Sequence, residues 1–250
     1  MSEAMTTKAA MVALITGANK GIGLETARQL GAQGIAVLVG ARDLKRGEAA
    51  AAQLKAEGID ARALKLDVTD GRDRKAAAEA IAHDFGRLDI LVNNAGIALE
   101  SMGANSTLTT GEEALRKIFD TNFFAVVALT DALLPLLRKS AAARIVNVSS
   151  ILGSLHLHAT EGSPIYNAKM FAYDASKTAL NAYTIHLAHA LRETKIKVNS
   201  AHPGWVKTDL GGPGAMMEIV DGAKTSVRLA MLPDDGPTGG YFHLNDTLPW

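Results

Sequence analysis

Residues 11–23 have the sequence MVALITGANKGIG, an apolar run followed by a glycine-rich turn. The run Met11–Thr16 is aliphatic and β-branched, which predicts a strand buried on both faces. Gly17, Gly21 and Gly23 permit a tight turn, and a helix starting near Ile22 would present its N-terminal amides to a phosphate. No Gly-Lys-Ser/Thr follows, so the turn is not a P-loop. The stretch predicts a strand, a pyrophosphate-binding turn and a helix.

The same alternation continues along the chain. Further strands are predicted at Ile35–Gly40, Ala61–Leu66, Leu88–Asn93, Arg144–Ser149 and Lys195–Ala201, and helices near 22–32, 44–57, 70–85, 112–138 and 172–193. Regular strand–helix alternation indicates a parallel sheet with helices on both faces. We therefore predict one doubly wound, Rossmann-type α/β domain over residues 9–250, after a disordered tail at residues 1–8. The glycine-rich stretch at 209–222 is a candidate lid loop over the carboxyl ends of the strands.

Composition excludes several classes of function. Lys plus Arg and Asp plus Glu both total 26, so no net field favours nucleic acid or an anionic membrane. The absence of cysteine excludes disulfides, thiolate catalysis and cysteine-based zinc sites. His156 and His158 have no carboxylate cluster nearby, so no metal site is expected. The first apolar run is too short to span a bilayer, and the expected location is cytoplasmic.

The residues after the second predicted strand bear on the choice of dinucleotide. Asp43 lies about twenty residues past the glycine turn, where a carboxylate would bind the adenosine ribose and favour NAD. Arg42 precedes it and can hold a 2′-phosphate through two parallel bonds, while Lys20 adds a point charge. Asp43 has an alternative role as the N-cap of the next helix. We predict NADP(H).

Tyr173 and Lys177 are four residues apart in a helical pattern, so they share one helix face. A phenol with an ordinary pKa near 10 is a poor acid–base group at neutral pH. An ammonium about 4.5 Å away contributes roughly 4 kcal/mol at an effective dielectric of 20, about three pKa units. This arithmetic predicts that Lys177 brings Tyr173 close to working pH.

Other polar residues give this pair a setting. Ser149 and Ser150 close the fifth predicted strand, where its carboxyl end opens onto a cofactor cleft. Asn122 interrupts the apolar helical pattern and is either a helix-kinking residue or part of a polar relay. After the sixth strand, the turn from Pro203 to Thr208 offers backbone groups and a hydroxyl to a nicotinamide carboxamide.

In this order and at these intervals, the motifs resemble those of the short-chain dehydrogenase/reductase family over residues 11 to about 210. They are Thr16–Gly23, Asp67-Val68, Asn93-Asn94-Ala95-Gly96, Asn122, Ser150, Tyr173-x-x-x-Lys177 and Pro203-Gly204. Lys20, Arg42 and the sequence GWVKTD at 204–209 resemble the NADP-dependent carbonyl reductase branch.

The resemblance implies a role for each residue. Tyr173 would protonate the developing alkoxide, Lys177 would lower its pKa and hold the nicotinamide ribose, Ser150 would bind the substrate oxygen, and Asn122 would anchor a relay water. Asp67 and Val68 would meet the adenine, Asn93 the adenosine ribose region, and Val206 and Thr208 the carboxamide. The full expected cofactor-binding set is Gly17, Asn19, Lys20, Gly21, Ile22, Gly23, Arg42, Asp67, Val68, Asn93, Ala95, Gly96, Tyr173, Lys177, Pro203, Gly204, Val206 and Thr208.

The 22 residues between Ser150 and Tyr173 exceed the family's common interval. Tyr166 lies among them, but Met170 stands where a catalytic tyrosine needs its lysine. A larger insertion at this place accompanies monomeric carbonyl reductases, so the state is left open between monomer and homo-oligomer. The favoured activity is reduction of a small ketone or aldehyde by NADPH. The alternatives are an oxidative alcohol or hydroxysteroid dehydrogenase and, outside enzymes, a dinucleotide-sensing regulator.

Overall fold

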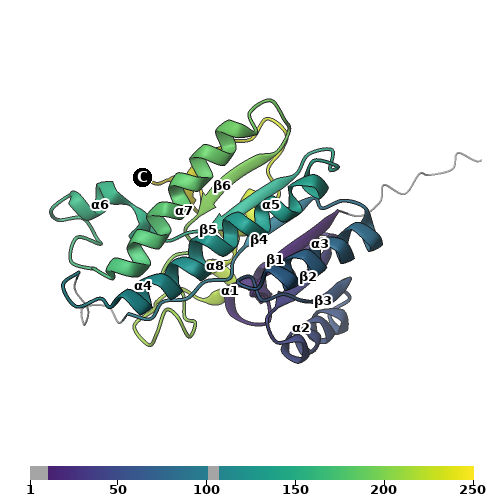
Figure 1. The fold of residues 1–250 in the computed structure, drawn as a ribbon, viewed down its shortest axis with the longest axis horizontal. Coiled ribbons are helices and arrows are strands. Elements are labelled where there is room, and N and C mark those ends of the chain that lie inside the picture. Colours follow the sequence, from purple (N-terminus) through teal and green to yellow (C-terminus); the bar gives the residue numbers. More distant parts are fainter. Residues whose placement is uncertain (1–10, 101–106) are drawn as a thin grey trace, which may run out of the picture.

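The computed structural model describes residues 11–100 and 107–250; the tail predicted at residues 1–8 lies outside this part. One eight-stranded sheet has the order β3-β2-β1-β4-β5-β6-β7-β8 (Figure 1). Every neighbouring pair from β3 through β7 is parallel, and only β8 runs antiparallel to β7. The strands are β1 (Val12–Thr16), β2 (Ala36–Ala41), β3 (Ala61–Lys65), β4 (Ile90–Asn93), β5 (Arg144–Val148), β6 (Lys197–Ala201), β7 (Tyr241–His243) and β8 (Asp246–Thr247). The predicted Rossmann-type fold is confirmed.

Helices cover both faces of this sheet, because strand residues alternate between two apolar cores. Val12 and Leu14 of β1 lie in one core, and Ala13 and Ile15 lie in the other. The first core takes residues from α3 (Gly71–Phe85), α5 (Ala125–Leu137) and α7 (Phe171–Ala190). The second takes residues from α1 (Gly21–Gly31), α2 (Leu44–Ala56) and α9 (Lys224–Ala230). Consecutive apolar residues in β1 are thus explained by burial on both faces.

The long helix predicted over 112–138 is divided. It consists of α4 (Glu112–Phe119), a π-helical turn at Asp120–Phe124 and α5. The turn is centred on Asn122, the residue at which the sequence pattern is interrupted. Such turns insert one extra residue into a helix and occur often at functional sites.

Several short elements were not predicted. They are β7, β8, the 3₁₀ turn Ile151–Gly153, α6 (Leu155–Ala159), α8 (Ile219–Gly222) and α9. Elements of two to seven residues show too few periods for a pattern to be seen. One consequence is that the loop predicted over 209–222 is shorter, because its last four residues form α8.

The stretch Glu112–Leu137 is apolar and long enough to cross a membrane by composition, with a mean hydropathy of 1.4. In the fold, however, Leu129, Leu133 and Leu137 lie fully buried in the core beneath α5. The apolar face of this helix is therefore used for packing on the sheet.

The strand order also indicates where on the sheet a ligand would bind. β1 pairs with β2 on one side and with β4 on the other, so the chain reverses direction across the sheet at β1 and β4. In open α/β sheets, ligands bind outside the carboxyl ends of the strands at such a reversal. The glycine turn follows β1 and the Asn93–Gly96 segment follows β4, which puts both at this point.

Candidate active site

The glycine turn after β1 has the backbone that a close ligand requires. Gly17 and Gly21 adopt φ angles of +62° and +58°, in the region that favours glycine. A Cβ on Gly23 would lie 2.5 Å from the amide nitrogen of Asn94 and 2.7 Å from the carbonyl oxygen of Gly17. No side chain caps the N-terminus of α1, and its first turn carries no acidic residue. The amides of Gly21, Ile22 and Gly23 can therefore meet an anion.

The segment after β4 is braced against this turn. The hydroxyl of Thr16 accepts from the backbone N–H groups of Asn94 and Ala95, both at 2.9 Å. The Asn94 side chain donates back to the Thr16 carbonyl at 2.8 Å. Ala95 and Gly96 are thereby fixed beside the glycine turn, as the cofactor assignment needs.

The side chain of Asn93 points into the core. Its side chain is buried and donates to Asn147 at 2.9 Å and to Thr130 at 3.2 Å. Because the side chain faces the core, any contact of Asn93 with a ribose must come from its backbone. Its amide instead joins β4 to β5 and α5.

Ser150, Tyr173 and Lys177 come together at the carboxyl end of β5. The hydroxyl groups of Ser150 and Tyr173 are hydrogen-bonded to each other. The Lys177 ammonium donates to the carbonyl of Val148 at 2.8 Å and lies 5.6 Å from the centre of the Tyr173 ring. Ser149 is also buried, but only Ser150 bonds Tyr173, which agrees with the choice of Ser150 over Ser149.

Burial dominates the ionisation of this group. It raises the pKa of Tyr173 to about 12, with the Ser150 hydrogen bond acting in the opposite direction. Burial also lowers the pKa of Lys177 to about 8. The charge arithmetic from sequence predicted a phenol near working pH and is wrong for the chain alone, since it omitted desolvation. Tyr173 is consequently protonated at neutral pH, the form that a proton donor needs.

Asn122 connects the π-helical turn to this group. Its side-chain oxygen accepts from the backbone N–H of Ile97, and its amide donates to the Ile97 carbonyl, both at 2.9 Å. The amide also donates to the Ser176 hydroxyl at 3.1 Å, which donates to the Tyr173 carbonyl at 2.7 Å. A Cβ on Gly96 would lie 3.4 Å from Asn122 Oδ1 and 3.6 Å from Lys177 Nζ. Asn122 thus lies at the interruption of the helix, as one of the two alternatives predicted, and its part in a polar relay stays a prediction.

A hollow of about 310 Å³ beside the glycine turn is lined by Asn19, Lys20 and Arg46, among others. Asp43 caps α2 by accepting from the Arg46 N–H at 3.2 Å, as its alternative role predicted. Within residues 11–100 and 107–250, no carboxylate lies within ion-pair distance of Arg42. Lys20 pairs with Asp209, so its charge lies beside the 202–218 segment. Arg46, in the first turn of α2, was not predicted from the sequence as part of this site.

The remaining expected cofactor residues lie in the loops that follow β3 and β6. Asp67 accepts from the Thr69 N–H at 3.0 Å in the loop after β3, and Val68 is buried next to it. A Cβ on Gly21 would lie 3.5 Å from the Thr208 methyl carbon, so Thr208 faces the glycine turn. The Val206 side chain packs against Gly222, and its carbonyl accepts from the Thr208 N–H at 2.8 Å. Pro203 and Gly204 start this turn, and Gly204 has a φ of +92°.

Glu100 was not predicted from sequence. Its carboxylate is buried and accepts from the N–H groups of Tyr173 at 2.9 Å and of Ala172 at 3.2 Å. It therefore caps α7, which has no cap of its own at Met170. No local signal could have found this contact, because 73 residues separate Glu100 from Tyr173.

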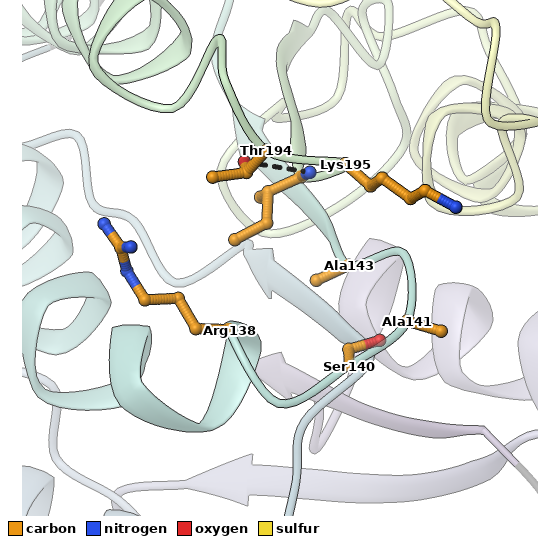
Figure 2. Close-up of a pocket in the computed structure, with 7 residues that line it drawn as sticks. Arg138, Ser140, Ala141, Ala143, Thr194 and Lys195 are labelled. Carbon is orange, nitrogen blue, oxygen red and sulfur yellow. Dashed lines mark hydrogen bonds between the residues drawn. The ribbon is translucent and has the colours of Figure 1, made fainter.

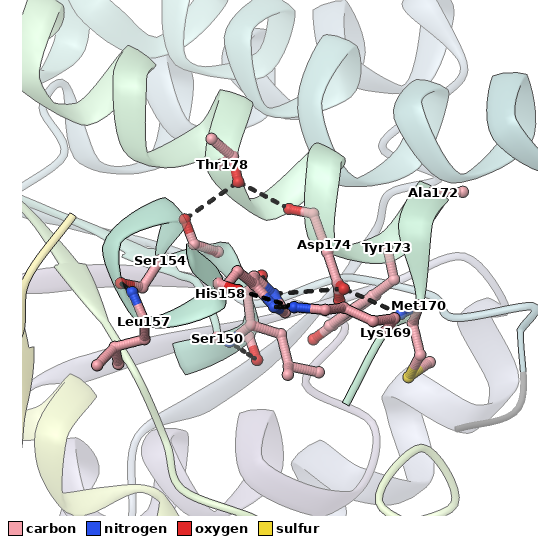
Figure 3. Close-up of polar contacts among 12 residues, drawn as sticks. Ser150, Ser154, Leu157, His158, Lys169, Met170, Ala172, Tyr173, Asp174 and Thr178 are labelled. Carbon is pink, nitrogen blue, oxygen red and sulfur yellow. Dashed lines mark hydrogen bonds and ion pairs between the residues drawn. The ribbon is translucent and has the colours of Figure 1, made fainter. Parts of the chain in front are cut away.

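Residues 151–170, the long interval before Tyr173, are tied to α7 by polar contacts (Figure 3). His158 lies 3.4 Å from the Asp174 carboxylate and meets the Leu152 carbonyl at 2.9 Å. Lys169 lies 3.0 Å from the other ring nitrogen of His158. Burial, reinforced by the charge of Glu100, raises the pKa of Asp174 to about 7. His156 and His158 lie on helix α6, and His158 serves to dock this segment.

A second hollow, of about 200 Å³, lies at the other edge of the sheet and is lined by residues that include Arg138, Ser140 and Lys195 (Figure 2). It borders the amino ends of β5 and β6, away from Tyr173. None of the catalytic candidates lines this second hollow. The candidate active site is therefore the group of Ser150, Tyr173 and Lys177 at the carboxyl end of β5.

Comparisons with known proteins identify the family to which the chain is similar. A family model described as short chain dehydrogenase matches residues 11–215. Carbonyl reductase [NADPH] 1 of Homo sapiens is 35% identical, covering 96% of this chain and 98% of the relative. Salutaridine reductase of Papaver bracteatum is 34% identical and covers 94% of each. The crystal structure of NADPH-bound carbonyl reductase from chicken fatty liver superposes with a TM-score of 0.84 at 29% identity, covering 96% of this chain and 99% of that one.

Proposed function

Because the chain belongs to the short-chain dehydrogenase/reductase family, we propose that it is an NADPH-dependent reductase of ketones or aldehydes, with Tyr173 as the proton donor. The observation that carries the proposal is the buried, protonated phenol of Tyr173 hydrogen-bonded to Ser150. The named relatives carbonyl reductase and salutaridine reductase support reduction as the activity.

The residues around the glycine turn fit a dinucleotide. The uncapped N-terminus of α1 and the space that a Cβ on Gly23 would fill are features that a pyrophosphate requires. Asn19 and the amides of residues 21–23 would hold the pyrophosphate, Asp67 and Val68 the adenine, and the Pro203–Thr208 turn the carboxamide. Ala95 and Gly96 would lie under the nicotinamide half, where Lys177 can reach the ribose.

Three cations, Lys20, Arg42 and Arg46, support NADP(H) over NAD(H) as the cofactor. Arg42 carries an exposed guanidinium, and Lys20 and Arg46 line the adjoining hollow. Asp43 caps α2 and its carboxylate lies 3.6 Å from the Arg46 guanidinium, so it is engaged within the protein. Lys20 is likewise paired with Asp209. Arg42 has no carboxylate partner among the described residues, and its guanidinium can bind a 2′-phosphate bidentately.

When bound, the dinucleotide would supply a hydride for the carbonyl carbon. Ser150 donates a hydrogen bond to the carbonyl oxygen and so orients it toward Tyr173. The phenol delivers its proton to this oxygen as negative charge develops there, so that a hydride and a proton together yield the alcohol. The Lys177 ammonium lies beside the phenol and stabilises the phenolate left behind. Asn122, through Ser176, holds the backbone carbonyl of Tyr173 in place.

The same residues support the two alternatives, an oxidative dehydrogenase and a dinucleotide sensor, less strongly. An oxidative dehydrogenase needs an ionised base, and a phenol with a pKa of about 12 provides little of it at neutral pH. A dinucleotide sensor has no need for an intact Ser150, Tyr173 and Lys177 group. We also propose a cytoplasmic location, since Glu112–Leu137, the stretch of the described residues that is long and apolar enough to cross a membrane, packs on the sheet.

The proposal is tested by NADPH oxidation with a panel of ketones, aldehydes and quinones, run beside NADH. We expect turnover with NADPH and little with NADH. Rates with NADH that equal or exceed those with NADPH would contradict the cofactor assignment, and no turnover with any carbonyl would contradict the activity.

A further inference from the structure

His202, which lies between β6 and the Pro203-Gly204 turn, joins two loops of the active site. Its Nδ1 accepts from the backbone N–H of Ile151 at 3.2 Å and from that of Gly204 at 3.4 Å. Ile151 directly follows Ser150, and Gly204 belongs to the turn expected at the carboxamide. One ring nitrogen thus contacts both the loop that follows Ser150 and the Pro203–Thr208 turn.

Sheet pairing between the strands that carry these two loops ends just before the loops begin. β5 and β6 are paired up to Val148 and Ala201, and the Ser149 N–H donates to the Ala201 carbonyl at 2.8 Å. Beyond this bond the strands end, and Ser150 is held from β7, where the Tyr241 hydroxyl donates to its carbonyl. The His202 ring bridges the gap directly after the last ladder bond, so it replaces sheet pairing with a side-chain contact.

The surroundings keep this ring neutral and fixed. His202 is 8% exposed, and burial, with the neighbouring His243 as a second cause, lowers its pKa to about 3. The His243 ring lies 4.9 Å away, centre to centre, and its Nδ1 lies 3.0 Å from the His202 carbonyl. The His202 N–H donates to the Phe242 carbonyl at 2.7 Å. An imidazole that accepts at Nδ1 carries its proton on Nε2.

We propose that His202 is a positioning residue that sets the distance between the carbonyl held by Ser150 and the hydride donor held by the Pro203–Thr208 turn. The inference rests on the proposed function. Reactant geometry is sensitive, since a displacement of about 1 Å can cost on the order of 100-fold in rate. His202 touches neither substrate nor reacting atoms in this account and acts through Ile151 and Gly204.

Two near-isosteric variants separate the two ring nitrogens. His202→Asn places an acceptor where Nδ1 lies, whereas His202→Gln places its polar group closer to Nε2; His202→Leu removes both. We expect Asn to keep kcat within about threefold of wild type, and Gln and Leu to lower kcat roughly 10- to 100-fold, with a smaller change in KM for the carbonyl.

The deciding readout is the primary isotope effect with 4-deuterated NADPH, which does not depend on the fraction of folded enzyme. The hydride step becomes slower when the loops lose register, so the isotope effect on kcat should increase in Gln and Leu and stay at the wild-type value in Asn. Thermal denaturation of each variant checks folding, and Gln decides alone if Leu does not fold. Wild-type isotope effects and rates in Gln, or an equal loss in Asn and Gln, would overturn the positioning role. A wild-type protein that reduces no carbonyl would overturn the proposed function, and this inference with it.

Discussion

The Lys177 ammonium donates to the Val148 carbonyl at 2.8 Å, and this bond fixes it beside the Tyr173 ring at the end of β5. The strand end therefore positions the lysine, and the helix positions the tyrosine. Burial disfavours the charged form of both groups, and it raises the pKa of Tyr173 to about 12 and lowers the pKa of Lys177 to about 8.

The charge of Lys177 should make the rate of reduction depend on pH. The pKa of Lys177 is lowered to about 8, so its charge is present below pH 8 and is lost above it. Because that charge stabilises the phenolate formed on proton transfer, kcat for carbonyl reduction should fall as the pH rises through about 8. A pH series of kcat at saturating NADPH measures it. A flat profile up to pH 10 would contradict the assignment of Lys177.

Substitution of Arg42 should act on NADPH and spare NADH. Arg42→Ala removes a guanidinium from the expected 2′-phosphate corner, and hydrogen bonds to charged groups contribute about 1.5–3 kcal/mol, or roughly 10- to 100-fold in affinity. The KM for NADPH should rise by that factor, while the KM for NADH should not change. Arg116→Ala is the matched control, since Arg116 is an exposed arginine on α4 that pairs with Glu112. Equal effects on both dinucleotides would place Arg42 elsewhere.

Gly23→Ala should prevent dinucleotide binding. Its Cβ would meet the Asn94 amide nitrogen at 2.5 Å and the Gly17 carbonyl oxygen at 2.7 Å, so the turn or its brace must shift. Overpacking of this kind costs about 1–3 kcal/mol of stability, and NADPH affinity measured by fluorescence titration should fall with it. Gly71→Ala is the control, because the nearest atom to its new Cβ is the flexible end of Arg74 at 3.4 Å. Normal NADPH binding by Gly23→Ala would count against the glycine turn as the pyrophosphate site.

Asp174 should make stability depend on pH. Its pKa is raised to about 7 in the fold, so the folded chain binds this proton more tightly than the unfolded chain does, and stability falls as the pH rises from about 4 to 7. The groups that face it are His158, Glu100 and Lys169. Asp174→Asn should raise the Tm above pH 7 and leave it nearly unchanged at pH 4. A Tm gain that is the same at both pH values would show that ionisation is not its cause.

The sequence was sufficient for the fold and for the residues whose roles depend on nearby neighbours. The alternation that begins at Met11 predicted, to within two residues, six of the eight strands in the described part of the chain, and the four-residue spacing of Tyr173 and Lys177 predicted their shared face. Glu100 and His202 could not be found this way, since their contacts cross 73 and 51 residues and exist only once the sheet has formed. The ionisation of Tyr173 was also beyond reach, because desolvation depends on the packed structure.

The central claim is that Tyr173 supplies the proton, and Tyr173→Phe tests it most directly. Phenylalanine keeps the ring and removes only the hydroxyl, so NADPH should still bind with near wild-type affinity in a fluorescence titration. In single-turnover mixing with a carbonyl that the wild type reduces, the rate of NADPH oxidation should fall by about 100- to 10,000-fold. A Tyr173→Phe protein that binds NADPH and oxidises it at the wild-type rate would contradict the account.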